Sequence, residues 1–549
     1  MSKIGMLNGE GRRYALAMVA TGFIAGTAAA QVVSVRSEVD SSRSFTPLQS
    51  YTMAESHDGL LFFCGLKSMG RHDLARDGRE SFPGEHFNRS VHLFDLDTKT
   101  TLSGSIEHFS ATMLETLTVT NPQSVQYGDT LYIYGGYGPV SDSRGWATRD
   151  TVTTVDLAAV RDAIVQQQPI PESAFVSQTA PLAQVAGGRI LKLGGYHLLV
   201  GGAGFIGNYA DIDNFVTQYS ERIHLFDPNR SFIDPVRTWV DPEYHRRDGN
   251  VTPITIGPYG DQRPGFLFHG GVFKPGNEFQ PEAWEHPLTF DSGDMTVTVD
   301  RSFEQMMNQY EGARVSFHSE SKGENYIITM GGLSASRWDG SQFVPDFAIP
   351  WVIDASMITT RDGRAVDERI VGAAINPVTN TEFVPNAALP TNSIGQILWD
   401  ELPPGETLLG HYYGGIEARS PGSSAITEAS SRVYAVYGTI DKIELEATPI
   451  VAGQDAVFTL TNADPDAGLT FAYSVDGPGP RFVPALQLSI DLTPPVRVFA
   501  RRRADANGEA TVTMRVPSNA PAREIWIQAV MEEGRGFEKS NLIADTIQN

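Results

Sequence analysis

The sequence predicts an all-β protein built from two kinds of β-domain. A short apolar stretch that ends in a glycine pair recurs through residues 35–440. The apolar stretches are rich in Val, Ile, Tyr and Phe and are separated by turns, with 53 Gly and 33 Pro in 549 residues. Near Lys442 the pattern changes to closely spaced segments of alternating apolar and polar residues. Because the chain is too long for one ordinary core, we expect two or three domains.

The N-terminal segment is typical of a secretory signal peptide. Lys3, Arg12 and Arg13 precede the apolar run "YALAMVATGFIAG", and small residues lead up to Gln31. We expect residues 1–30 to be removed on export by the Sec or the twin-arginine route. The alternative is an uncleaved anchor, but the run is shorter than the ~20 residues that a membrane span needs. The prediction is a secreted, periplasmic or cell-surface protein with no membrane span after cleavage.

Charge and cysteine content narrow the classes of partner. The formal net charge of −23 repels phosphate backbones, so we expect neither nucleic acid nor anionic lipid as a partner. We expect a glycan or protein ligand and a monomeric chain. Cys64 is the only cysteine, so no disulfide forms within the chain, and its apolar surroundings predict a buried core residue.

The stretch "YHLLVGGAGFIGNY" has the G-x-G-x-x-G spacing of a dinucleotide-binding turn between Gly202 and Gly207. It resembles the opening of extended short-chain dehydrogenases, and Asp227 follows at the distance of a ribose-binding acid. That family begins with this turn and needs Tyr-x-x-x-Lys, whereas here the turn comes late and no tyrosine has a lysine four positions on. Repetition explains the glycines instead.

Five glycine pairs follow similar apolar stretches, and "LLFFCG", which ends at Gly65, is a degenerate first copy. The pairs are Gly135 and Gly136, Gly201 and Gly202, Gly270 and Gly271, Gly331 and Gly332, and Gly414 and Gly415. A second strand-like segment follows most copies and ends in aspartate, at Asp95, Asp156, Asp227, Asp291 and Asp354. Asp227 therefore belongs to a repeated pattern.

A unit of strand, Gly-Gly, variable loop and strand ending in Asp resembles the kelch repeat. The resemblance implies a six-bladed kelch-like β-propeller of the exported bacterial type over residues 31–440. The copies are spaced roughly 60 to 85 residues apart, against ~50 for a kelch unit, so the excess is expected in loops such as 66–90, 203–220 and 272–287. Glycine fits where neighbouring blades leave no room for Cβ and φ is positive. Each aspartate is expected to accept backbone N–H groups in the following turn.

Two further predictions concern the segments before and after the propeller repeats. The segment "VVSVRSEV", residues 32–39, could close the ring by pairing with the last blade. Residues 441–549 contain seven short alternating strands, which predict a small Ig-like β-sandwich as an accessory or attachment module. Within it, the acidic stretch "NADPDAG" is either a solvated turn or a Ca²⁺ loop.

Candidate ligand-binding residues come from the polar segments before two glycine-pair strands. "EYHRRDGN" supplies His245, Arg246, Arg247 and Asp248, and "GARVSFHS" supplies Arg314 and His318. Arginines beside a carboxylate and an imidazole can clamp a carboxylate or sugar hydroxyls. The alternative is that these charges pair with one another and with blade turns.

The leading functional prediction is a non-catalytic exported module that binds a glycan or a protein, with no cofactor and no metal. The alternative is a carbohydrate-active enzyme that works through His245, Arg247 and Arg314. One such resemblance is to exported kelch propellers that interconvert sialic acid anomers, with a channel carboxylate or imidazole as acid–base. Another is to galactose oxidase and its relatives, which hold copper with two Tyr and two His and cross-link one Tyr to Cys. The corresponding residues here are the Tyr-His pairs at 196–197 and 244–245, His411 beside Tyr412, and Cys64.

Overall fold

The structure, a computed structural model, describes residues 33–548 with several gaps. The gaps are residues 68–69, 72–81, 210–214, 231, 259, 273, 276–282, 347, 424, 487 and 534–535. The predicted signal peptide lies outside the described residues, as do parts of the three long loops. Within the described part, no helix is long and apolar enough to span a membrane.

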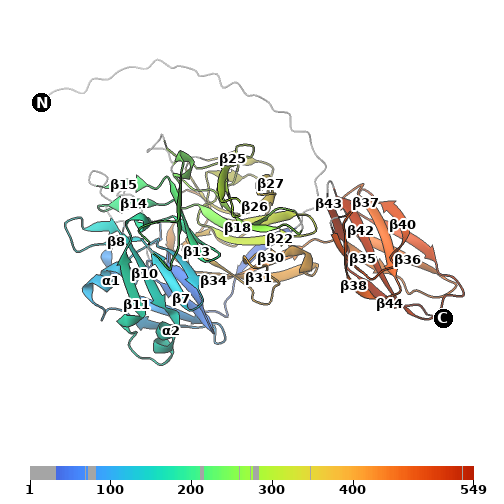
Figure 1. Cartoon of the computed structure of the whole chain (residues 1–549), viewed down its shortest axis with the longest axis horizontal. Coiled ribbons are helices and arrows are strands. Elements are labelled where there is room, and N and C mark those ends of the chain that lie inside the picture. Colours follow the sequence, from blue (N-terminus) through green and yellow to red (C-terminus); the bar gives the residue numbers. More distant parts are fainter. Residues whose placement is uncertain are drawn as a thin grey trace, which may run out of the picture.

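Four antiparallel sheets of four strands follow one another along the first half of the chain (Figure 1). The first contains β2 (Thr52–Ser56), β3 (Gly59–Phe63), β4 (Ser90–Asp95) and β5 (Thr101–Ser105). The second contains β6 (Gln123–Tyr127), β7 (Thr130–Tyr134), β10 (Thr151–Asp156) and β11 (Phe175–Thr179). The third contains β12 (Arg189–Leu193), β13 (Tyr196–Val200), β16 (Arg222–Phe226) and β17 (Arg237–Val240). The fourth contains β18 (Asn250–Ile256), β19 (Arg263–His269), β20 (Leu288–Asp291) and β21 (Thr296–Val299). In each sheet the spatial order follows the chain order, which is the arrangement of a β-propeller.

The chain continues into a nine-stranded sheet that its first described strand completes. One side of this sheet contains β22 (Ala313–Ser319), β23 (Glu324–Leu333), β26 (Trp351–Arg361) and β27 (Arg364–Ala373), with β30 (Ile397–Leu398) beside β22. The other side contains β29 (Phe383–Pro385), β31 (Gly405–Tyr413), β34 (Val433–Ile440) and β1 (Val33–Val39). β1 runs antiparallel to β34, from Val33 opposite Ile440 to Val39 opposite Tyr434. The predicted pairing of the "VVSVRSEV" segment with the last strands is confirmed.

Apolar side chains fill the space between neighbouring sheets. Between the third and fourth sheets, Leu198 and Val200 pack with Phe266, Phe268 and Phe290, all of which are buried. Because each sheet packs face to face against the next, the β-branched and aromatic residues of the repeated stretches form a series of joined cores.

The glycine pairs lie at the junctions between sheets. The first glycine of each pair has φ between 57° and 65°, the second between 86° and 95°, and Cys64 and Gly65 adopt the same pattern with φ of 59° and 86°. A Cβ on Gly135 would lie 2.2 Å from the carbonyl oxygen of Val185, in the segment before the first strand of the next sheet. The backbone N–H of Gly136 donates to that same oxygen at 3.0 Å. Positive φ is confirmed at all five pairs. A Cβ on the first glycine would lie within 2.7 Å of a neighbouring carbonyl oxygen in four pairs, whereas at Gly331 it would meet no atom nearer than 3.4 Å, so the predicted lack of room does not hold there.

Four of the five repeated aspartates accept backbone N–H groups of the residues that follow, as predicted, whereas Asp354 lies inside β26 and no turn follows it. The Oδ1 atom of Asp95 accepts from the backbone nitrogens of Asp97 and Thr98 at 3.0 and 2.7 Å, and that of Asp227 accepts from Asn229 at 3.0 Å. The residues after Gly202 form a strand, and no helix begins there. Both findings agree with the rejection of a dinucleotide-binding turn.

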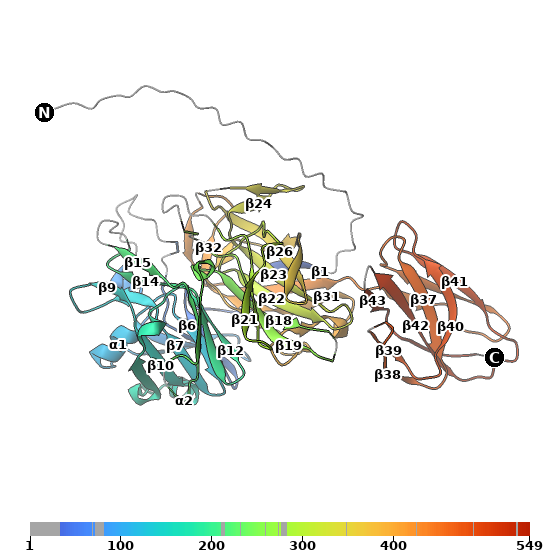
Figure 2. The same ribbon diagram turned by 45° about the horizontal axis from the view of Figure 1, so that its top comes forward.

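Short strands stand on the face where the glycine pairs emerge, and Figure 2 shows them beyond the larger sheets. They are β8 (Tyr137–Pro139), β9 (Trp146–Thr148), β14 (Ala203–Ile206), β15 (Val216–Tyr219), β24 (Ser336–Trp338), β25 (Phe343–Pro345), β28 (Val378–Thr379), β32 (Ile416–Ala418) and β33 (Thr427–Ala429). The helical elements are α1 (Ala111–Leu117), α2 (Leu157–Val165), η1 (Gly84–His86), η2 (Glu172–Ala174), η3 (Pro181–Ala183), η4 (Pro242–Tyr244) and η5 (Trp399–Glu401). The sequence reading did not anticipate α1 or α2. The repeat aspartate Asp156 caps the N-terminus of α2, with its side chain accepting from the backbone nitrogen of Ala159.

The C-terminal part is a separate all-β unit with its own core (Figure 1). One sheet contains β35 (Glu444–Ala447), β36 (Asp455–Thr461) and β41 (Ala510–Arg515). A second contains β40 (Arg497–Arg503), β37 (Gly468–Ser474), β42 (Glu524–Glu533), β43 (Gly536–Lys539) and β44 (Ile543–Thr546), and a third pairs β38 (Pro478–Val483) with β39 (Leu488–Leu492). Phe458, Leu460, Phe471, Ile527 and Ala529 lie in the buried core of this unit.

Ionic and aromatic contacts join this unit to the propeller. The Lys322 Nζ atom lies 2.9 Å from Glu538 Oε2, and both side chains are less than a tenth exposed. The ammonium groups of Lys322 and Lys442 lie 5.0 and 4.8 Å from the centre of the Trp399 ring. A buried ion pair and two cation–π contacts therefore lie at the junction between the two parts.

Candidate functional site

Each repeat has one residue with a positive φ shortly before its first strand, which is the strand nearest the propeller axis. These residues lie around that common axis. Their φ values fall between 47° and 66°. They are Ser50, Asn121, Gly187, Asp248, Glu311 and Asn380. Backbone N–H groups of this set donate to carbonyl oxygens of the corresponding residue in the preceding sheet, for example Asn121 to Ser50 at 3.0 Å and Asp248 to Gly187 at 2.8 Å. We call this set the axial ring.

The axial ring brings side chains from several sheets to one concave site of about 310 Å³. It is lined by Ser50, Tyr51, Asn121, Pro122, Gln123, Gly187, Gly188, Arg189, Glu311, Asn380, Thr381 and Glu382. Most of these residues are polar or charged, which suits a small ligand with many hydrogen-bonding groups. We call this site the axial pocket.

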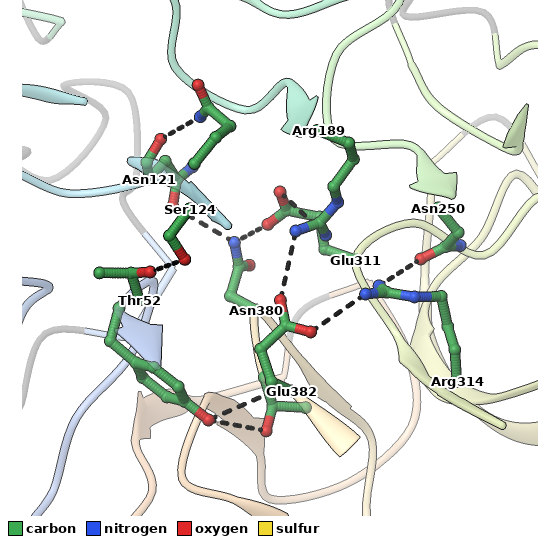
Figure 3. Close-up of polar contacts among 12 residues, drawn as sticks. Thr52, Asn121, Ser124, Arg189, Asn250, Glu311, Arg314, Asn380 and Glu382 are labelled. Atoms are coloured by element: carbon green, nitrogen blue, oxygen red, sulfur yellow. Dashed lines mark hydrogen bonds and ion pairs between the residues drawn. The ribbon is translucent and has the colours of Figure 1, made fainter. Parts of the chain in front are cut away.

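Two arginines and two glutamates form an ion-pair network at the axial pocket, and Figure 3 shows their side chains pointing toward one another. The Glu382 carboxylate lies between both arginines, 3.3 Å from Arg189 Nη1 and 3.1 Å from Arg314 Nη2. Arg189 Nη2 lies 3.5 Å from Glu311 Oε1. The side chain of Asn380 donates to Glu311. Because Arg189 belongs to the third sheet, and Arg314 and Glu382 lie in or beside opposite sides of the nine-stranded sheet, the network forms only when the propeller is assembled.

Glu311 is the acid in this network whose pKa is perturbed. Burial raises its pKa to about 7, the nearby Asp248 adds to the rise, and Arg189 opposes it. Its side chain is almost fully buried, and Glu311 is among the residues that line the pocket. A carboxyl group that titrates near neutral pH inside a concave polar site can hold or release a proton there.

We predict that the stability of the protein depends on Glu311 between about pH 5 and pH 8. The folded-state pKa lies above the ordinary value of 4.5, so the protonated acid favours folding. This contribution is complete at low pH and is lost as the pH rises through about 7. In thermal unfolding, the melting temperature of Glu311→Gln minus that of the wild type should therefore increase with pH across this window. The exposed Glu446→Gln is the control, and an equal pH dependence in both variants would contradict the prediction.

Residues between β29 and β31 contact the fourth sheet and β22. β30 pairs with the inner side of β22, and Gln396 is fully buried beside it. The Gln396 side chain accepts from the hydroxyl of Thr255 at 2.7 Å and donates to the hydroxyl of Ser316 at 2.9 Å.

The structure does not bring His245, Arg247 and Arg314 together in one cavity, contrary to the enzyme hypothesis based on these three. The His245 ring stacks on Tyr219 with the ring centres 4.0 Å apart. Arg247 pairs with Asp248 at 3.0 Å and lies over the Phe205 ring at 5.3 Å. Arg314 alone of the three joins the network at the axial pocket.

The remaining candidate ligand-binding residues, Arg246, Asp248 and His318, also lie in different surroundings. Arg246 is fully buried, with its guanidinium 4.5 Å from the centre of the Trp284 ring, so it packs between sheets. Asp248 is a member of the axial ring. His318 lies at the far end of β22, with its Nδ1 atom 3.2 Å from Asn325 Oδ1, and does not line the pocket.

Sequence reasoning missed Arg189, Glu311, Glu382, Asn121 and Asn380. The candidates were chosen by the density of charged residues along the sequence, which is high in "YHRRDGN". Most side chains of that segment pack between sheets. Each missed residue lies at the axial ring or two residues after it. Superposing the repeats on the starts of their innermost strands, instead of on their glycine pairs, would have placed these residues in one set.

Comparisons with known proteins give similarity to solved structures only. No protein-family model matches the chain, and no curated protein matches it in sequence. The chain is similar to YjhT at 13% identity, with 70% of this chain and 97% of that one covered and a TM-score of 0.39. It is similar to a fungal alcohol oxidase of the AA5 family in complex with copper at 12% identity, with 92% and 98% covered and a TM-score of 0.36. A subtype N10 neuraminidase-like protein matches at 9% identity, with 73% and 99% covered and a TM-score of 0.30.

Those identities and TM-scores support no inference about ligand or chemistry. The β-propeller assignment rests on the order of the sheets, the pairing of β1 with β34 and the axial ring. The residues proposed for a copper site do not fit one, because Cys64 is buried in an apolar cluster. Among the described residues, no three His, Cys, Asp or Glu side chains are grouped to hold a metal ion.

Proposed function

We propose that the protein is an exported six-bladed propeller that binds a glycan through its axial pocket. The C-terminal unit is then an Ig-like sandwich that serves as an accessory module. The single observation that carries the proposal is the axial pocket with its network of two arginines and two glutamates. Its groups offer donors and acceptors in fixed positions, as recognition of sugar hydroxyls requires.

The shape of the axial pocket favours a glycan over a protein partner. The site is small, concave and polar, which suits the end of a glycan chain, whereas a specific protein interface needs a much larger area. The polar lining also offers few apolar anchors of the kind that dominate protein interfaces.

The test is thermal unfolding of the full exported chain against neutral sugars, amino sugars, sugar acids and oligosaccharides. A sugar at ~100 times its Kd stabilises the folded state by about 2.7 kcal/mol. We expect at least one sugar class to raise the melting temperature. A panel in which no sugar raises it would reject the proposal.

A second candidate function is catalysis on the bound sugar, and Glu311 is the observation that favours it. A buried carboxyl whose pKa is raised to about 7 is suited to general acid–base chemistry near neutral pH. Arg189 and Arg314 would then orient the substrate. Proton NMR of each sugar that binds would reveal anomer exchange or bond cleavage, and the enzyme reading requires that Glu311→Gln abolish turnover while binding remains.

A further inference from the structure

Strand β40 of the C-terminal unit is unusually basic for so acidic a chain. It carries Arg497, Arg501, Arg502 and Arg503, all of them exposed, in a protein of net charge −23. At ~3.3 Å per residue these four positions extend along roughly 20 Å of strand. Their pairing with β37 places Arg501 and Arg503 on one face of the sheet and Arg497 and Arg502 on the other, so the edge strand carries arginines on both faces. We call these four residues the arginine stripe.

The charges of the arginine stripe are not neutralised within the described part of the chain. None of the four forms an ion pair there, although many other arginines do. Arg502 donates to the carbonyl oxygen of Arg501 at 2.9 Å, and Arg503 donates to that of Asp466 at 2.7 Å. By contrast, Arg515 on β41 pairs with Asp455 at 3.1 Å. The stripe therefore keeps free guanidinium donors for an external anion.

The edge position of β40 favours contact through side chains. In the described residues β40 pairs with β37 alone, and the pairing shifts register at Phe471 and Ala472. An irregular edge covered by charged side chains resists the addition of another strand. A partner would consequently meet the guanidinium groups and not the backbone.

The stripe lies away from the axial pocket. Both views show β40 on the side of the C-terminal unit that points away from the propeller (Figures 1 and 2). The buried Lys322–Glu538 pair holds the two parts together. A partner bound along β40 would leave the pocket open.

We propose that the arginine stripe binds an anionic polysaccharide, with carboxylate groups of the polymer paired with guanidinium groups on both faces of this edge strand. A single polymer chain needs contact only along the stripe. A membrane plane would bring its charge against the acidic remainder of the protein as well, which costs energy. Planar guanidinium groups pair with carboxylates through two parallel hydrogen bonds. This site is independent of the proposed sugar site in the axial pocket.

The test is binding of the full exported chain to polygalacturonate, with uncharged dextran as the reference polymer. We expect salt-sensitive binding that falls at least tenfold in Arg501→Glu/Arg502→Glu/Arg503→Glu. The triple variant Arg222→Glu/Arg230→Glu/Arg364→Glu changes the net charge equally with exposed propeller arginines and should bind nearly as the wild type does. Should the first variant fail to fold, Arg501→Gln/Arg502→Gln/Arg503→Gln replaces it.

Four outcomes would overturn the proposal. The first is binding of the wild type to polygalacturonate that is no stronger than its binding to dextran. The second is an equal loss of polygalacturonate binding in the stripe variant and in the propeller variant. The third is polygalacturonate binding that the stripe variants leave unchanged. The fourth is tighter binding to double-stranded DNA, phosphatidylglycerol vesicles or polyglutamate than to polygalacturonate, which would assign the stripe to another class of polyanion.

Discussion

Replacing Arg189 with alanine is expected to abolish most sugar binding at the axial pocket. The guanidinium of Arg189 lines the pocket, contacts both glutamates, and is held in place by a hydrogen bond from Nε to the carbonyl oxygen of Gly249 at 3.1 Å. Its loss removes donors to the ligand and leaves Glu311 and Glu382 with less compensating charge. Truncation of such a group typically costs about 2 kcal/mol or more, roughly a thirtyfold rise in Kd. Calorimetric titration with the best sugar of the panel measures the change.

Arg263→Ala is the matched control for that experiment. Arg263 makes a two-point ion pair with Asp291, both contacts at 2.6 Å. It lies opposite Ile256, at the end of its sheet far from the axial pocket. The control should bind the sugar as the wild type does. If Arg189→Ala binds as tightly as Arg263→Ala, the pocket is not the sugar site.

The second large effect is on stability, at the junctions between sheets. Gly135→Ala would place a Cβ 2.2 Å from the carbonyl oxygen of Val185 and 2.6 Å from that of Ala183, at a φ of 59°. The left-handed conformation alone costs about 1–2 kcal/mol for alanine, and the two carbonyl groups must move as well. We expect a total loss of at least ~3 kcal/mol, measured as a lower melting temperature and a lower urea midpoint.

Gly128→Ala separates the two causes of that loss. Gly128 has a similar φ of 55°, but a Cβ there would meet no atom within 4 Å. Its replacement should therefore cost only the conformational part. Equal losses at Gly128 and Gly135 would contradict the account of the glycine pairs as close contacts between sheets.

The repeat architecture could be predicted because its constraints are local and recur. The glycine pairs need positive φ, and four of the five also leave no room for a Cβ, so each copy carries the same two letters. Even the degenerate copy, in which Cys64 replaces the first glycine, follows the same backbone path. The segments that follow the aspartate-ending strands were less predictable. Asp156, for example, ends β10 and also caps the N-terminus of α2.

The axial pocket could not be predicted in the same way, because its parts meet only through ring closure. Arg189 and Glu382 are 193 residues apart in sequence, yet their side chains are in contact. The locally charged segment around Arg246 drew attention instead, and its charges lie mainly against aromatic rings and neighbouring backbone. Charge density along a sequence does not distinguish residues that pack from residues that bind a ligand. Comparison of equivalent positions in successive repeats does distinguish them.

The central claim is that the axial pocket is the ligand site, and a crystal structure of the complex with the best-binding sugar tests it most directly. The account predicts the sugar within hydrogen-bonding distance of Arg189, Glu382 and Asn380, inside the axial ring. A sugar bound instead among the short strands of the rim, or on the C-terminal unit, would contradict it.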